Sequence, residues 1–117
     1  MPLINSASGK TVSKNVHFAK TFFQKFKGLM FERADNFDYA LVFELPRETR
    51  IGASVHMFFV FFPIGIIFLD SGKKVVDKAV LKPWMLNYTP KKAAKYFVEL
   101  QPEKISEIKL GEKLEWK

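Results

Sequence analysis

The chain contains few side chains that could carry acid–base or metal chemistry, and its two histidines come first among them. His17 and His56 are separated by 39 positions. That spacing matches no H-E-x-x-H or other short ligand motif, so the sequence predicts no histidine metal site and no cofactor. His56 lies in a long apolar run and is interpreted first as a buried histidine bonded to the backbone. An acid–base role for His56 in a cleft is the alternative.

Besides His56, the candidates for binding a ligand are Arg33, Asp70 and Trp84, and Glu99 is a further polar side chain in a predicted strand. Asp70 precedes Ser-Gly, which is typical of a tight turn whose carboxylate accepts backbone N–H bonds, and a carboxylate beside a pocket is the alternative. Arg33 could bind an anion, although a surface ion pair is the commoner role. Glu99 is expected to face solvent or to pair with a lysine. Because no G-x-S-x-G elbow, P-loop or G-x-G-x-x-G motif is present, the sequence assigns no catalytic residue.

Lysine-rich stretches suggest nucleic-acid binding as a different class of function. The net charge is +7, residues 1–31 contain no acid, and residues 73–95 contain seven lysines against Asp77 alone. These zones could form one basic face, with an aromatic side chain stacking on a base. A solvated surface is the commoner role of such lysines, and Trp84 would then anchor its loop onto the sheet. The candidates are Lys73, Lys74, Lys82, Trp84, Tyr88, Lys91 and Lys92.

The run from Ile51 to Leu69 is almost entirely apolar. It approaches the roughly 20 residues of a membrane span, but polar residues, glycines and Pro63 interrupt it. Two buried strands joined near Pro63 are therefore predicted, and no membrane span. Residues 58–62 are five consecutive apolar residues, and alternate members of a strand point to opposite faces. One set is expected in the core, and the other in a second buried layer, a partner or a ligand groove.

The elements that would position these residues follow from periodicity and turn chemistry. In the first half we expect a hairpin of strands 3–5 and 11–13, a helix over 18–27 capped by Gly28, and a strand over 39–45 ended by Pro46 and followed by a polar loop. In the second half we expect a hairpin of 66–69 with 74–81, a strand over 96–100, a helix from Pro102 to Gly111 with Ile105 and Ile108 inward, and a strand over 113–116. The sum is one α+β domain over residues 1–117, mainly an antiparallel, barrel-like sheet with two short helices.

The absence of cysteine excludes disulfides and thiolate chemistry and fits a reducing compartment. The first residues do not combine a basic segment with a long apolar stretch, as a signal peptide would. We therefore expect a cytoplasmic protein.

An ordered set of short motifs resembles the family known as domain of unknown function 192, or the UPF0127 group, in its archaeal form. The resemblance covers residues 10–117 and implies a compact β-rich α+β domain with no established activity, cofactor or catalytic residue. The motifs are Gly28-Leu29-Met30, a strand through Phe43, His56-Met57, Pro63-Ile64, Phe68-Leu69-Asp70 with Gly72, Pro83-Trp84, Glu99-Leu100 and Gly111.

Two departures from the family pattern bear on function. The usual Trp-Met-Lys-Asn-Thr reads His56-Met57-Phe58-Phe59-Val60, and the usual Pro-Leu-Asp reads Pro63-Ile64-Gly65. Apolar residues thus replace polar ones, which weakens an interpretation as an enzyme. The leading hypothesis is a small non-enzymatic binding or accessory domain, whose apolar groove, rimmed by lysines, takes a protein or a small apolar ligand. A nucleic-acid-binding protein with a lysine-rich face and an enzyme with a cleft around His56 are the alternatives.

Overall fold

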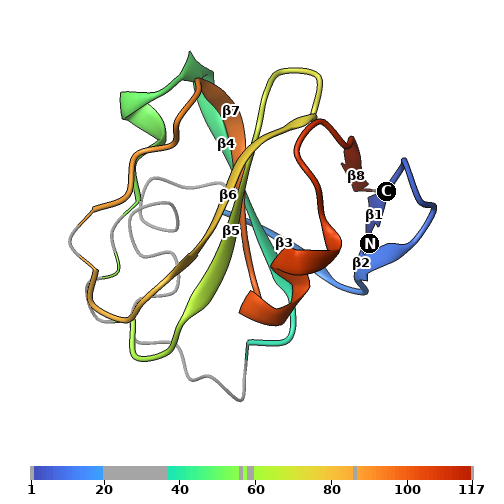
Figure 1. Ribbon diagram of the computed structural model, residues 1–117, viewed down its shortest axis with the longest axis horizontal. Coiled ribbons are helices and arrows are strands. Elements are labelled where there is room, and N and C mark those ends of the chain that lie inside the picture. The colour runs from blue at the N-terminus through green and yellow to red at the C-terminus, as the bar shows by residue number, and fades with distance from the viewer. Residues whose placement is uncertain (1, 20–36, 56, 58–59, 86, 117) are drawn as a thin grey trace.

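The computed structural model describes residues 2–19, 37–55, 57, 60–85 and 87–116, which form two β-sheets (Figure 1). The small sheet has the strand order β2-β1-β8 and the large sheet the order β3-β4-β7-β5-β6. The small sheet lies on one side of the large sheet, and the described parts of the connections before β5 and after β6 lie on the other. The elements are β1 (Leu3–Asn5), β2 (Thr11–Ser13), β3 (Val16–Ala19), β4 (Ala40–Thr49), η2 (Ile51–Ala53), β5 (Ile64–Leu69), β6 (Val75–Leu81), β7 (Ala94–Leu100), η3 (Pro102–Glu107) and β8 (Leu114–Trp116).

The large sheet is antiparallel except for the parallel pair β3–β4. All six residues of β5 are buried, because both faces of this strand are covered. Within the described residues β3 and β6 form open edges, so the sheet does not close into a barrel. The predicted α+β class with a mainly antiparallel sheet is confirmed, and of the two forms expected, sheet or barrel, the described residues form sheets.

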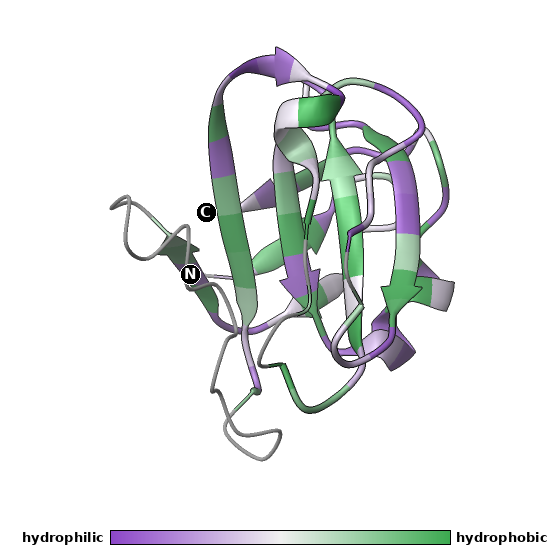
Figure 2. Ribbon diagram, turned by 90° about the vertical axis from the view of Figure 1, so that its left-hand side faces the viewer, coloured by the Kyte–Doolittle hydropathy of each residue, from purple (hydrophilic) through white to green (hydrophobic). Residues whose placement is uncertain are grey.

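Each face of the large sheet has its own core, because successive side chains of a strand point to opposite faces. One core, here the loop-side core, packs β4, β5 and β7 against the described residues between η2 and β5, and includes Leu41, Phe43, Ile66, Phe68 and Phe97. The other, the small-sheet core, packs the same strands against β1, β8 and η3, and includes Val42, Ile67, Leu69, Val98 and Ile108. Figure 2 shows the hydrophobic residues along the strands of the large sheet. Complete burial of one such side chain stabilises the fold by about 1.5–3 kcal/mol.

The hairpin of β5 and β6, the hairpin of β1 and β2, and strands β7 and β8 confirm the predicted elements. The prediction that Pro46 ends a strand is wrong, because β4 continues to Thr49. The β4–β7 register shifts between Glu44 and Thr49, so Pro46 lies where regular pairing is interrupted. A proline is tolerated there because no ladder hydrogen bond needs its missing N–H.

The apolar run forms only one strand, β5, within the described residues, so the prediction of two strands is wrong. The residues before Pro63 fold into η2 and an irregular layer in which Val55 makes an isolated bridge to Tyr88. Burial accounts for the apolar composition of this layer, since its described members Ala53, Val55, Met57, Val60 and Phe62 are all in the loop-side core. Residues 56, 58 and 59 lie outside the described residues.

The two expected helices have different outcomes. Phe18, at the start of the first expected helix, lies instead in β3 opposite Val42. Pairing with β4 therefore outweighs the helical spacing of the aromatic residues at this position. Residues 20–27 lie outside the described residues. The second is the 3₁₀ helix η3, which ends at Glu107, with Ile105 and Ile108 buried as predicted. In the described part of the chain, no helix is long and apolar enough to cross a membrane.

Candidate functional site

An exposed aromatic surface lies at one end of the large sheet, where β5 begins and β6 ends. Because Ile64 pairs with Leu81, the residues just before β5 and just after β6 flank the same corner. There Phe61, Trp84 and Met85, here called the aromatic end, are 59%, 44% and 37% exposed. The Phe61 and Trp84 rings meet edge to face with centroids 5.5 Å apart. A large apolar group left in solvent is typical of a binding surface.

Backbone hydrogen bonds hold this surface in place. The Met57 N–H donates to the Met85 carbonyl at 2.8 Å, and the Trp84 N–H donates to the Met57 carbonyl at 3.0 Å. Met57 itself is fully buried, so the turn carrying Trp84 is anchored to the loop-side core. Trp84 has φ +62°, in the left-handed region that bulky side chains rarely adopt. Such a conformation costs of order 1–3 kcal/mol and tends to occur at functional sites.

Glu99 is a second unusual feature, because it is an acid in the middle strand of the large sheet. It lies directly between Leu41 of β4 and Ile66 of β5 and is 4% exposed. Its Oε1 atom is buried and has no hydrogen-bond partner among the described residues. Removal from water raises the pKa of Glu99 to about 8, so its carboxyl group is mainly protonated at neutral pH. The expectation that Glu99 faces solvent or pairs with a lysine is therefore wrong.

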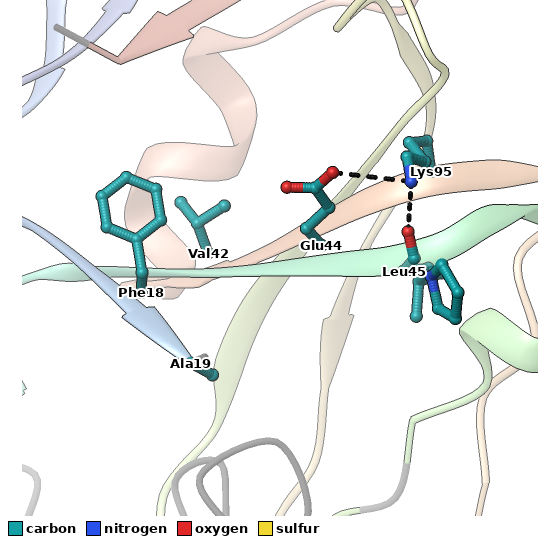
Figure 3. A pocket seen from close by; sticks show the side chains of 7 residues that line it. Phe18, Ala19, Val42, Glu44, Leu45 and Lys95 are labelled. Atoms are coloured by element: carbon teal, nitrogen blue, oxygen red, sulfur yellow. Dashed lines mark hydrogen bonds and ion pairs between the residues drawn. The ribbon is translucent and has the colours of Figure 1, made fainter. Parts of the chain in front are cut away.

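A hollow of about 440 Å³ lies along β3 and β4, on the face of the small-sheet core (Figure 3). Phe18, Val42 and Glu44 point into it from one side of the sheet. Lys95 lies at its other end, 3.5 Å from the Glu44 carboxylate, and also donates to the Leu45 carbonyl. Since the two charges offset one another, the hollow provides apolar walls and a neutral ion pair.

The predicted lysines are separated by the strand directions, and only Lys82 lies at the aromatic end. β6 ends at the aromatic end with Leu81 and begins at the opposite end of the sheet with Val75. Lys73 and Lys74 directly precede Val75, so they lie at that opposite end. Lys91 and Lys92 lie there too, because the Lys91 N–H donates to Asp77 near the start of β6 at 3.0 Å. Asp77 and Lys82 are five strand residues apart, about 17 Å. The apolar surface is therefore not rimmed by the predicted set of lysines.

The remaining predicted site residues have local structural partners or lie outside the described residues. Asp70 Oδ1 accepts the N–H groups of Gly72 and Lys74 at 2.9 and 3.0 Å, as its turn role requires. The Tyr88 ring stacks near Phe68, and its hydroxyl donates to Asp77 at 2.8 Å. Lys73 holds its ammonium 4.2 Å from the Trp116 ring centre. His56 and Arg33 lie outside the described residues.

Sequence reasoning missed Glu99 as a buried group and Phe61 as an individually exposed one. The signal for Glu99 was its position between Val98 and Leu100 in an otherwise apolar strand segment, which is typical of a strand buried on both faces. The alternation expected for residues 58–62 holds for its described members, since Val60 and Phe62 are buried and Phe61 is exposed. Among the described residues no group of three metal-ligating side chains converges.

The family model DUF192, described as "Uncharacterized ACR", matches residues 3–116. The chain belongs to the DUF192 family. A UPF0127 protein of Thermococcus sibiricus is 45% identical over 97% of this chain and 73% of its own length. A UPF0127 protein of Pyrococcus furiosus is 47% identical over 97% of both chains. The predicted resemblance is therefore confirmed, and the family to which this DUF192 chain belongs is one of unknown function.

Two solved structures have the same fold as this DUF192 chain. A protein of Sinorhizobium meliloti, titled a putative transcription regulator, aligns with TM-score 0.80 over 97% of this chain and 89% of its own. A protein of unknown function from Novosphingobium aromaticivorans aligns with TM-score 0.75 over 99% and 93%. Both are 20% identical to this chain, which establishes the shared fold alone.

Proposed function

We propose that the protein is a small non-enzymatic binding domain that docks a segment of a partner protein on its aromatic end. The observation that carries this proposal is the contact of Phe61 with Trp84, two large rings held against each other while both stay half exposed. Tryptophan in particular is enriched among the residues that dominate binding energy at protein interfaces. Covering the exposed part of either ring would contribute about 2–3 kcal/mol.

A protein segment suits this surface better than a small apolar ligand. Small ligands bind in concave pockets that enclose most of their surface. The hollow of about 440 Å³ along β3 and β4 is lined by other residues and does not include Phe61, Trp84 or Met85. An exposed pair of rings in edge-to-face contact supports a partner that brings its own groove or apolar side chains.

Backbone strain at Trp84 supports the same proposal. A left-handed conformation at a bulky residue stabilises nothing by itself, yet two hydrogen bonds with Met57 maintain the turn. The neighbouring residues 60–63 and 82–85 include one charged side chain, Lys82. The preferred partner segment therefore combines apolar anchors with a nearby carboxylate.

Peptide binding to a single-tryptophan protein tests this proposal. The variant Trp116→Phe leaves Trp84 as the only tryptophan, so its fluorescence reports directly on the aromatic end. Short synthetic peptides with a Phe-Leu-Leu anchor should be compared with acidic flanks, with lysine flanks, and with the anchor replaced by serines. We expect a blue shift and saturable binding for the acidic-flanked peptide, weaker binding for the lysine-flanked one, and none for the serine peptide.

A matched pair of variants localises the binding. Phe61→Ser should weaken binding about 30-fold, which corresponds to a loss of roughly 2 kcal/mol. Leu110→Ser is the control, because Leu110 is 62% exposed and lies in the turn after η3. Failure of all three peptides to saturate at millimolar concentration would refute the proposal, as would equal losses from the two variants.

We also propose a cytoplasmic location for this domain. The absence of cysteine supports it, because secreted domains of this size often depend on disulfides. Fractionation of cells that express the full-length protein, with a periplasmic or secreted marker as control, would test the location.

A further inference from the structure

The topology gathers cationic side chains from three separate segments at the end of the large sheet opposite the aromatic end. β4 and β5 end there, and β7 and β6 begin there, since neighbouring pairs are antiparallel. Contacts confirm the convergence: Arg50 Nε donates to the Pro90 carbonyl at 3.0 Å, and the Ser71 hydroxyl donates to Glu48. The exposed cations of this surface, here called the basic end, are Arg47, Arg50, Lys74, Lys91 and Lys92.

The carboxylates at this end are used by internal hydrogen bonds. Glu48 accepts the Ser71 N–H and hydroxyl, and Asp70 accepts two turn N–H groups. Asp77 is buried and accepts the Tyr88 hydroxyl and the Lys91 N–H. Within the described residues no ion pair involves Lys74, Lys91 or Lys92. The cations thus outnumber the carboxylates and project into solvent.

We propose that the basic end is a second binding surface, for the phosphate backbone of a nucleic-acid duplex, without base-sequence preference. The four strand ends lie about 4.8 Å apart, so the cations spread over roughly 14 Å, enough to meet several phosphates. Three of its five cations are lysines, which act as point charges rather than as bidentate readers of bases, and Arg50 already donates to the Pro90 carbonyl. This surface is separate from the one that would dock a partner protein.

Aromatic side chains decide between duplex and single strand. Proteins that bind single strands stack bases on exposed aromatic residues. Among the described residues at the basic end the large exposed apolar side chain is Ile51, whereas Trp84 lies at the other end and Tyr88 is engaged with Asp77. The geometry therefore favours contacts with phosphates alone, as a duplex presents them.

Fluorescence anisotropy with a labelled 20-base-pair DNA duplex tests this proposal over a series of salt concentrations. If three to four cations contact phosphates, a plot of log affinity against log salt should have a slope of about −3 to −4. The affinity would then fall about 100-fold between 50 and 200 mM salt. A flat plot overturns the proposal.

A pair of charge-matched variants locates the surface. The triple variant Lys74→Glu, Lys91→Glu, Lys92→Glu should lose binding at least 100-fold. The triple variant Lys10→Glu, Lys14→Glu, Lys82→Glu changes the net charge equally at exposed positions elsewhere and should retain most of the affinity. Equal loss from both triples would show that net charge alone attracts DNA.

Two competitors complete the test. A single strand of the same length should compete less well than the duplex, and polyglutamate of equal charge should also compete less well. Preferential binding of the single strand would overturn the assignment to a duplex, and stronger competition by polyglutamate would assign the surface to an acidic protein. Circular dichroism of both triple variants confirms folding, which exposed positions should not disturb.

Discussion

Replacing Glu99 by glutamine should change how the stability of the protein depends on pH. Glu99 is buried, its Oε1 atom has no hydrogen-bond partner in the described part of the chain, and burial raises its pKa from 4.5 to about 8. The folded state therefore keeps its proton up to about pH 8, while the unfolded state loses it near pH 4.5. Between pH 4.5 and pH 8 the carboxyl group ionises only in the unfolded state, and this ionisation stabilises the unfolded state increasingly as pH rises. The unfolding free energy therefore falls as pH rises over this range.

The magnitude follows because each pH unit between the two pKa values changes the unfolding free energy by about 1.36 kcal/mol. Glu99 would lower the unfolding free energy by about 3 kcal/mol at pH 7 and by about 5 kcal/mol above pH 8, relative to acidic solution. Glutamine has nearly the same shape but cannot ionise, so Glu99→Gln removes this pH dependence. A buried amide without partners itself costs about 1–3 kcal/mol, so the slope is more informative than the absolute stability.

Urea unfolding at pH 5, 6, 7 and 8 measures this effect. The unfolding free energy of Glu99→Gln minus that of the natural sequence should increase by about 4 kcal/mol from pH 5 to pH 8. Glu103→Gln is the matched control, because Glu103 is exposed in the first turn of η3. If the Glu99→Gln and natural profiles run parallel over this range, the burial and protonation of Glu99 are not as described.

Three further expectations concern packing and ionisation. Lys73→Ala should lower the unfolding free energy by about 0.5–2 kcal/mol, because the Lys73 ammonium lies 4.2 Å from the Trp116 ring centre and joins the β5–β6 turn to β8. Denaturant titration followed by Trp116 fluorescence measures this loss, and Lys73→Arg should retain most of the stability. Gly65→Ala should destabilise by about 1–3 kcal/mol in the same assay, since its Cβ would lie 2.5 Å from Ile105 Cγ1; an unchanged midpoint would contradict this close packing. Tyr88, whose pKa is raised to about 12 by burial and then by its carboxylate partner, should stay un-ionised at pH 11 in an ultraviolet titration, with Tyr88→Phe as the control.

Local signals were sufficient for the hairpins and for the class of the fold. The turn at Asp70 is specified by its own side chain, which accepts two N–H groups of that turn, so β5 and β6 could be placed from a few residues. The proline rule failed at Pro46 because a register shift with β7 removes the need for its N–H. That shift depends on the partner strand and cannot be read from local sequence.

The candidate surfaces were harder to predict because they depend on strand direction. Lysines near one another in the sequence, such as Lys82 and Lys91, lie at opposite ends of the sheet. Arg50, by contrast, is distant in the sequence but donates to the carbonyl of the residue before Lys91. The exposure of Trp84 likewise depends on how its turn is tied to Met57. Composition gave the number of charges and aromatic rings, but only the pairing of distant strands determines which of them share a surface.

The position of β1 has a consequence for synthesis on the ribosome. β1 is the middle strand of the small sheet, and Leu3 pairs with Trp116. At 5–20 residues per second, β1 waits roughly 5–20 s for that partner to be translated. Until then β1 can pair only with β2 in the small sheet, and a lone hairpin is marginally stable in water. Leu3 and Val12, which are buried in the finished protein, would remain exposed on the nascent chain for that interval, so chaperone contact is expected there first.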